Sequence, residues 1–230
     1  MILDYFLSLD PMAFFRAMPG TAAQGIIWGI MALGVYITFR ILDFPDLTVD
    51  GSLATGAAVA VMLIQGGMHP AAALLFSVLA GMAAGLATGV LHTVLGIPGI
   101  LASILTQVSL YSVNLGIMGK SNQGIGLTQQ NLVASSRYVT GEDSWIFFVK
   151  LIVGCLVLVA VIYWLFGTEM GASIRATGCN PQMARAQGIN TNFMKVLALM
   201  ISNGLVGLCG GILAQYQGAA DVNMGRGEIV

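Results

Sequence analysis

The stretch WIFFVKLIVGCLVLVAVIYWLF, residues 145–166, decides the fold class of this chain. A helix that crosses a lipid bilayer needs about 20 mostly apolar residues, and Lys150 is the one charged side chain in the stretch. Trp145 and Trp164 lie near its two ends, where membrane helices concentrate aromatic side chains. Strands of a membrane barrel would alternate apolar and polar residues, whereas residues 151–165 are almost continuously apolar. The sequence therefore predicts an all-α integral membrane protein.

The composition of the whole chain agrees with a lipid environment. Of its 230 residues, 57% are hydrophobic and 8% are charged, against about 25% charged residues in soluble domains. The net charge of -1 provides no basic patch, so we expect no nucleic-acid partner. The cysteines, Cys155, Cys179 and Cys209, are far apart and form no C-x-x-C pair. We therefore predict neither a metal site nor a cofactor.

Further apolar stretches have the length of spanning helices, alone or with their flanks. They are residues 21–42, 51–64, 70–95, 100–118 and 193–215. The second of them reaches the required length only if residues 47–50 begin the same helix. The sequence thus predicts a polytopic helical bundle of about six spans, formed by residues 21–230. Aromatic side chains in residues 1–20 indicate a short helix lying at the membrane surface.

Small residues recur at four-residue spacing in several of these stretches. The examples are Gly25 and Gly29, then Gly81, Gly85 and Gly89, then Gly207 and Gly211. Ridges of small residues let helix backbones approach closely in lipid. This pattern predicts a tightly packed bundle and carries no information about function.

Residues 43–50, DFPDLTVD, place three carboxylates and a proline between two apolar stretches. A carboxylate at the centre of a lipid-exposed helix costs roughly 2.5–3.5 kcal/mol. Pro45 removes a backbone donor and disfavours helix at Phe44. We expect a broken helix beside a polar pathway, as transporters use, with Asp50 capping a helix that starts at Gly51. An ordinary surface loop with a capping aspartate is the alternative.

A second polar segment, residues 167–192, separates the last two spans and contains the signals of a short helix. Asn180 suits the N-cap, Pro181 suits the first helical position, and Gly188 suits the residue after the end. The spacing predicts a helix over residues 181–187, outside the bilayer. A capped helix of this kind is shaped to dock into a partner, although a simple connector would look the same.

These two polar segments carry a family resemblance. The run IRATGCNPQMARAQGIN, residues 174–190, resembles the cytoplasmic coupling segment of ABC importer permeases of the branched-chain amino-acid, ribose and nucleoside type. The run RILDFPDLTVDGS, residues 40–52, resembles the subgroup associated with tryptophan and tyrosine uptake. Two departures stand out. Cys179 replaces an expected acidic or polar residue, and family members continue into further spans, so we expect a truncated permease domain.

The resemblance implies a permease subunit of an ATP-driven importer in the bacterial inner membrane, with a tryptophan- or tyrosine-like amino acid as the expected solute. It implies a second permease copy, as a homodimer, two cytosolic ABC ATPase subunits and an extracytoplasmic substrate-binding lipoprotein. The chain contains no G-x-x-x-x-G-K-[ST] loop, so it is not expected to be an enzyme. The residues implied to couple to the ATPase are Arg175, Asn180, Pro181, Arg185 and Gly188.

Polar side chains within or beside apolar spans are expected to face the bundle interior and line the pathway. These residues are Asp46, Thr48, Asp50, Gln107, Asn114 and Asn203. For each amide, a hydrogen bond between helices is the alternative. For the chain as a whole, the alternatives are an ion-coupled secondary transporter that uses Asp46 or Asp50 as a proton or sodium site, and a membrane scaffold that transports nothing.

Overall fold

The computed structural model describes residues 11–126, 132–135 and 144–226 of the chain. The described elements are α2 (Pro11–Tyr36), η1 (Ile37–Ile41), α3 (Thr48–Gln65), α4 (Pro70–Thr93), α5 (Gly99–Met118), β1 (Asn122–Gly124), α6 (Ser144–Gly167), α7 (Glu169–Cys179), α8 (Pro181–Ala186), α9 (Thr191–Gln217) and β2 (Ala219–Asp221). Among them, six helices are long and apolar enough to cross a membrane. The prediction of a polytopic all-helical membrane protein is confirmed.

The predicted spans agree with the observed helices to within a few residues. The stretch 145–166 is α6, and the short apolar run at 51–64 is extended at its N-terminus so that α3 begins at Thr48. The first helix differs more, because residues 11–20 form the first turns of α2 and continue into the span. Residues 1–10, the rest of the expected surface segment, lie outside the described part of the chain.

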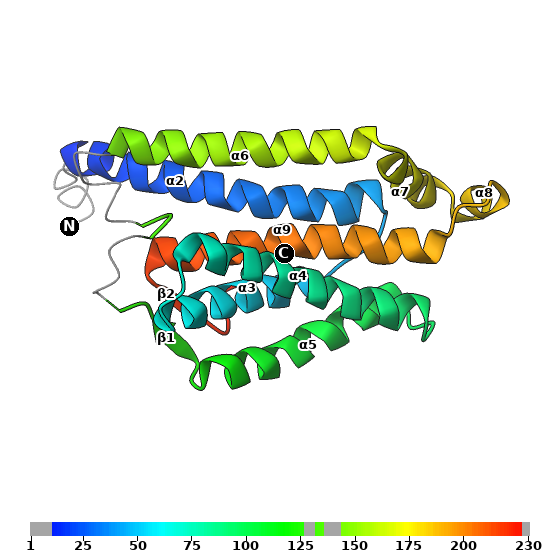
Figure 1. Cartoon of the computed structure of the whole chain (residues 1–230), viewed down its shortest axis with the longest axis horizontal. Helices are drawn as coiled ribbons and strands as arrows, with labels where there is room; N and C mark the ends of the chain where they lie inside the picture. The colour runs from blue at the N-terminus through cyan, green and yellow to red at the C-terminus, as the bar shows by residue number, and fades with distance from the viewer. Residues whose placement is uncertain (1–10, 127–131, 136–143, 227–230) are drawn as a thin grey trace, which may run out of the picture.

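Helix α9 is the centre of the bundle. It lies against α2, α3 and α4, while α5 packs on α3 and α4 (Figure 1). Helix α6 keeps apolar side chains such as Leu156 and Val157 exposed, as a helix that faces lipid does. Helices α7 and α8 lie at one end of the bundle, and the short antiparallel ribbon of β1 and β2 lies toward the other end (Figure 1).

Glycines produce the close packing of α9 against its neighbours. A Cβ atom at Gly81 would collide with the backbone oxygen of Asn203, and a Cβ at Gly85 would collide with that of Leu199. The predicted ridge on α4 is therefore confirmed, because only a residue without a side chain allows this approach. At Gly25 and Gly29 a Cβ would meet nothing within 4 Å in the described structure, so these two glycines make no close contact among the described residues.

Candidate functional site: a broken helix, a buried polar network and a cavity

The first polar segment interrupts the helices as the sequence predicts. Helix η1 ends at Ile41, and no helix forms until Thr48. Asp43 adopts a φ of 54°, a left-handed conformation that aspartate tolerates better than most residues. Phe44 then packs edge-on against the His92 ring, with 5.2 Å between the ring centroids. The chain thereby turns back toward the bundle interior before α3 starts.

The residue that caps α3 is Asp46 and not Asp50, so that prediction is wrong. The N-cap position of α3 is Leu47, which has no capping side chain. One carboxylate oxygen of Asp46 accepts a hydrogen bond from the backbone N–H of Thr48 at 2.9 Å and satisfies a free donor of the first turn. Asp50 lies in that first turn, where its charge suits the positive end of the helix dipole.

Asp46 is the centre of a buried polar network between α3, α4 and α9. Its second carboxylate oxygen accepts from the Asn203 side-chain amide at 2.7 Å. The Asn203 carbonyl in turn accepts from the Ser52 hydroxyl at 2.7 Å. Thr48 and Thr88 share a hydroxyl–hydroxyl bond of 2.7 Å. All five of these side chains belong to buried residues, so the network is a closed set of polar groups inside an apolar bundle.

Burial of Asp46 and its hydrogen bonds act on the carboxyl group in opposite directions. Burial raises the pKa of the Asp46 carboxyl above its ordinary value, and hydrogen bonds from Thr48 and Asn203 oppose that rise. Both oxygens of the carboxylate accept bonds from N–H groups. Donors directed at both oxygens match the acceptors of a carboxylate. The hydrogen bonds of Asp46 thus hold the break before α3 against α9.

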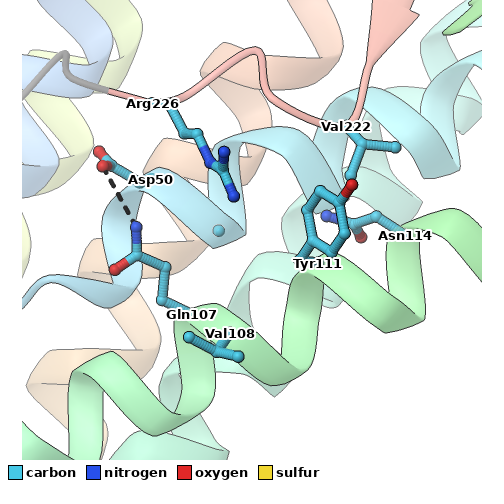
Figure 2. Close-up of a pocket in the computed structure, with 8 residues that line it drawn as sticks. Asp50, Gln107, Val108, Tyr111, Asn114, Val222 and Arg226 are labelled. Carbon is cyan, nitrogen blue, oxygen red and sulfur yellow. Dashed lines mark hydrogen bonds between the residues drawn. The ribbon is translucent and has the colours of Figure 1, made fainter. Parts of the chain in front are cut away.

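A cavity of about 200 Å³ lies between α3, α5 and the segment that follows β2 (Figure 2). Its lining consists of Asp50, Gly51, Gln107, Val108, Tyr111, Asn114, Val222 and Arg226. The Gln107 amide donates to the Asp50 carboxylate over 3.4 Å. The guanidinium carbon of Arg226 lies 5.4 Å from the centre of the Tyr111 ring, within the range of a cation–π contact.

The six predicted pathway residues therefore separate into two groups. Asp46, Thr48 and Asn203 meet in the buried network, and Asp50, Gln107 and Asn114 line the cavity. Asn114 is fully buried, yet neither its amide nitrogen nor its oxygen has a hydrogen-bond partner in the described structure. Sequence reasoning missed Arg226 and Tyr111. Arg226 follows the last span in a polar segment, and no local signal brings it to α5.

The second polar segment contains the predicted short helix. Helix α8 begins at Pro181, and the Asn180 side chain accepts from Gln182 N and Met183 N at 3.0 and 3.1 Å. Gly188 follows the end of α8 with a φ of 84°. Arg185 is not free: its Nε donates to the Thr191 hydroxyl at 2.7 Å and fixes α8 to the start of α9.

Helix α7 was not predicted, and it connects the second polar segment to the first. Its N-cap is Thr168, whose hydroxyl accepts from Gly171 N at 3.4 Å, a signal that the sequence does contain. Arg175 is exposed on α7. Near the other end of α7, a Cβ at Gly178 would collide with the backbone oxygen of Ile41. The α7–α8 segment thus rests directly on the last residue before the break.

Comparison with known proteins shows a family of transport permeases. The family model described as "Branched-chain amino acid transport system / permease component" matches residues 18–230. A tyrosine transport system permease protein of Clostridioides difficile is 42% identical over 208 residues, which are 90% of this chain and 67% of that protein. An uncharacterised protein of Rickettsia prowazekii is 36% identical over 204 residues, 89% of this chain and 70% of the relative.

A more distant relative is an autoinducer 2 import system permease protein of Yersinia pestis. It is 30% identical over 211 residues, which are 90% of this chain and 56% of the relative. The chain therefore spans between about half and about two thirds of the length of these relatives. No solved structure matches the chain.

Proposed function

The chain belongs to the branched-chain amino acid transport permease family, and we propose that it passes an aromatic amino acid across the bacterial inner membrane. As a multi-pass permease component of an ABC import system, it works with ATPase and substrate-binding subunits. The observation that carries the choice of solute is the 42% identity to a tyrosine transport system permease over 90% of this chain. An amino acid also suits a cavity lined by both a carboxylate and a guanidinium.

The cavity beside α3 belongs to the pathway, and the buried network holds the pathway open. Asp50, Gln107 and Asn114 offer polar groups to a solute in an apolar bundle. Asp46, Thr48 and Asn203 fix the break that lets α3 start inside the bundle. Discontinuous helices of this kind are a recurring way to build solute sites in transporters.

A second copy of the chain completes the pathway. The cavity opens beside α5, whose outer face exposes Val108 at 65% and Val113 at 50%. Exposed apolar side chains next to a polar cavity suit a helix that packs against another permease helix, since lipid would otherwise close over the opening. A homodimer places two such cavities near one axis.

Helix α8 couples the permease to a cytosolic ATPase. Arg185 ties α8 to the start of α9, and Gly178 of α7 abuts the backbone of Ile41 at the end of η1. A push on α8 therefore reaches the broken segment through direct backbone contact. From there it reaches Asp46 and the first turn of α3, which forms one wall of the cavity.

The proposed experiment distinguishes docking of the ATPase on α8 from transmission of the movement of α8 to the broken segment. The permease is co-purified with its ATPase, and ATP-dependent L-tyrosine uptake is measured in proteoliposomes that carry the substrate-binding protein. A Gly/Ser replacement of residues 181–187 is expected to abolish both ATPase co-purification and uptake. Gly178→Ala is expected to keep the ATPase and lose most of the uptake, because the new methyl group collides with Ile41.

A matched control is Gly167→Ala, since a Cβ there meets nothing within 4 Å in the described structure; it is expected to transport normally. The mass of the purified complex is expected to correspond to two permease copies. Unchanged ATPase binding after the Gly/Ser replacement would contradict the coupling role of α8. Absence of ATP-dependent uptake of aromatic amino acids by the unmodified complex would contradict the proposed function.

A further inference from the structure

Two opposite charges line the cavity between α3 and α5. Asp50 comes from the first turn of α3, and Arg226 comes from the segment after β2 (Figure 2). The two side chains are far apart in the sequence, so only the fold brings them to one cavity. Arg226 reaches over the Tyr111 ring, at 5.4 Å from its centroid. A ligand in this space meets a carboxylate that pairs with a positively charged group and a guanidinium that donates hydrogen bonds to a negatively charged group.

A further polar group of the cavity is the amide of Asn114. Its side chain is completely buried, and neither of its polar atoms has a hydrogen-bond partner among the described residues. A buried amide without partners costs about 1–3 kcal/mol, and such groups are uncommon enough to require a reason. A ligand that carries both donors and acceptors would satisfy this amide.

We propose that the cavity binds the ammonium and carboxylate groups of a free α-amino acid, an inference that rests on the transport function proposed above. Asp50, held by the Gln107 amide, accepts from the ammonium group. The Arg226 guanidinium donates to the carboxylate, for which its planar arrangement of N–H groups is well suited. The Asn114 amide adds a bond to either group. Each charge of the ligand is then matched by an opposite charge or a polar atom.

The size of the cavity limits what it recognises. A volume of about 200 Å³ corresponds to roughly seven water molecules, which is enough for the amino-acid head group. The side chain of the ligand extends past Tyr111 and Val108, which are 38% and 65% exposed. The cavity recognises the head group common to α-amino acids, and selection among their side chains occurs outside this cavity.

The test is a binding measurement on the permease–ATPase complex in nanodiscs without the substrate-binding protein. Labelled L-tyrosine is the probe, and the competitors are L-leucine, tyramine, which lacks the carboxylate, and 3-(4-hydroxyphenyl)propionate, which lacks the amine. L-Leucine is expected to compete within about tenfold of L-tyrosine. Each analogue with one charge is expected to bind at least about tenfold more weakly, as the loss of a hydrogen bond to a charged group predicts.

Substitutions test which residue binds the ammonium group of the ligand and which binds its carboxylate. Asp50→Asn and Arg226→Gln are each expected to weaken L-tyrosine binding at least about tenfold, and Arg226→Lys is expected to weaken it less. Asp50→Asn should reduce the difference in binding affinity between L-tyrosine and the analogue without an amine. Arg226→Gln should reduce the difference in binding affinity between L-tyrosine and tyramine. Lys120→Gln and Glu169→Gln, both exposed and outside the cavity, are matched charge controls and should bind normally.

Two outcomes overturn the inference. If tyramine binds as tightly as L-tyrosine, no residue of the cavity binds the carboxylate. Recovery of binding in the double variant with Asp50→Arg and Arg226→Asp would show that the two residues serve as a structural pair. If either result appears while the unmodified complex still imports L-tyrosine with ATP, the transport function survives and only the head-group site is wrong.

Discussion

The polar side chains around Asp46 and those around Asp50 differ in how completely their hydrogen bonds are made. Around Asp46, the Asn203 amide donates to the carboxylate and to Leu199 O, and its oxygen accepts from Ser52. Around Asp50, the Asn114 amide lines an open cavity and has no partner among the described residues. The first cluster is closed, and the second has capacity left for a solute.

The difference separates structural from functional polarity in a membrane interior. A satisfied network in an apolar medium stabilises one arrangement of the backbone, because any movement breaks several bonds at once. An unsatisfied amide at a cavity carries an energetic cost that a partner in the cavity removes. The same two residue types, an aspartate near the start of α3 and an asparagine on a neighbouring helix, thus form a closed anchor in one cluster and the proposed binding surface in the other.

The largest expected effect comes from breaking the closed cluster. Asn203→Ala removes a donor to the buried Asp46 carboxylate and is expected to lower the free energy of unfolding by about 3 kcal/mol. The measurement is SDS-induced unfolding in mixed micelles followed by circular dichroism. Gln217→Ala is the matched control, since this amide is exposed on the same helix, and it should change stability by less than about 0.5 kcal/mol. A loss below about 1 kcal/mol for Asn203→Ala would mean that the network does not anchor the bundle.

The sequence predicts the spans well because length and apolarity are local properties. Helix α6 and the cap of α8 are found within one or two residues of their predicted positions. Glycine spacing is less informative, since Gly25 and Gly81 belong to the same pattern and only Gly81 packs against a neighbouring backbone. Which glycine is covered depends on the rotation of each helix in the bundle, and local sequence does not specify it.

The division of the candidate site could not be predicted from the sequence. Asn114 and Asn203 give the same signal, an amide within an apolar span. Whether each amide is hydrogen-bonded depends on residues that are distant in the sequence. Ser52, which bonds Asn203, lies 151 positions away in the chain. The capping role of Asp46 likewise depends on the left-handed turn at Asp43. These are tertiary features, and they place one set of polar residues in a closed network and the other at a cavity.

A smaller effect is expected from the link between α3 and α4 inside the closed cluster. The hydroxyls of Thr48 and Thr88 are 2.7 Å apart, and hydrogen bonds between membrane helices average about 0.6 kcal/mol. Thr88→Val is expected to cost about that amount, and Thr48→Val more, because the Thr48 hydroxyl also bonds Asp46. The double variant should cost little more than Thr48→Val alone. The SDS unfolding measurement applies again. Thr55→Val is the control, because Thr55 bonds the carbonyl of Gly51 on its own helix. Additive losses in the double variant would show that the two hydroxyls are not coupled.

The smallest expected change in stability, and the one with the opposite sign, belongs to the cavity. Asn114→Ala deletes an amide that has no partner in the described structure, so the free energy of unfolding should stay the same or rise by up to about 1 kcal/mol. The same variant should weaken L-tyrosine binding to the permease–ATPase complex, because the amide would bond the solute. Asn114→Ala and Asn203→Ala are identical chemical changes in the two clusters. If both lowered stability by about 3 kcal/mol, the contrast between a closed network and an open site would fail, because Asn114 would then need a structural partner.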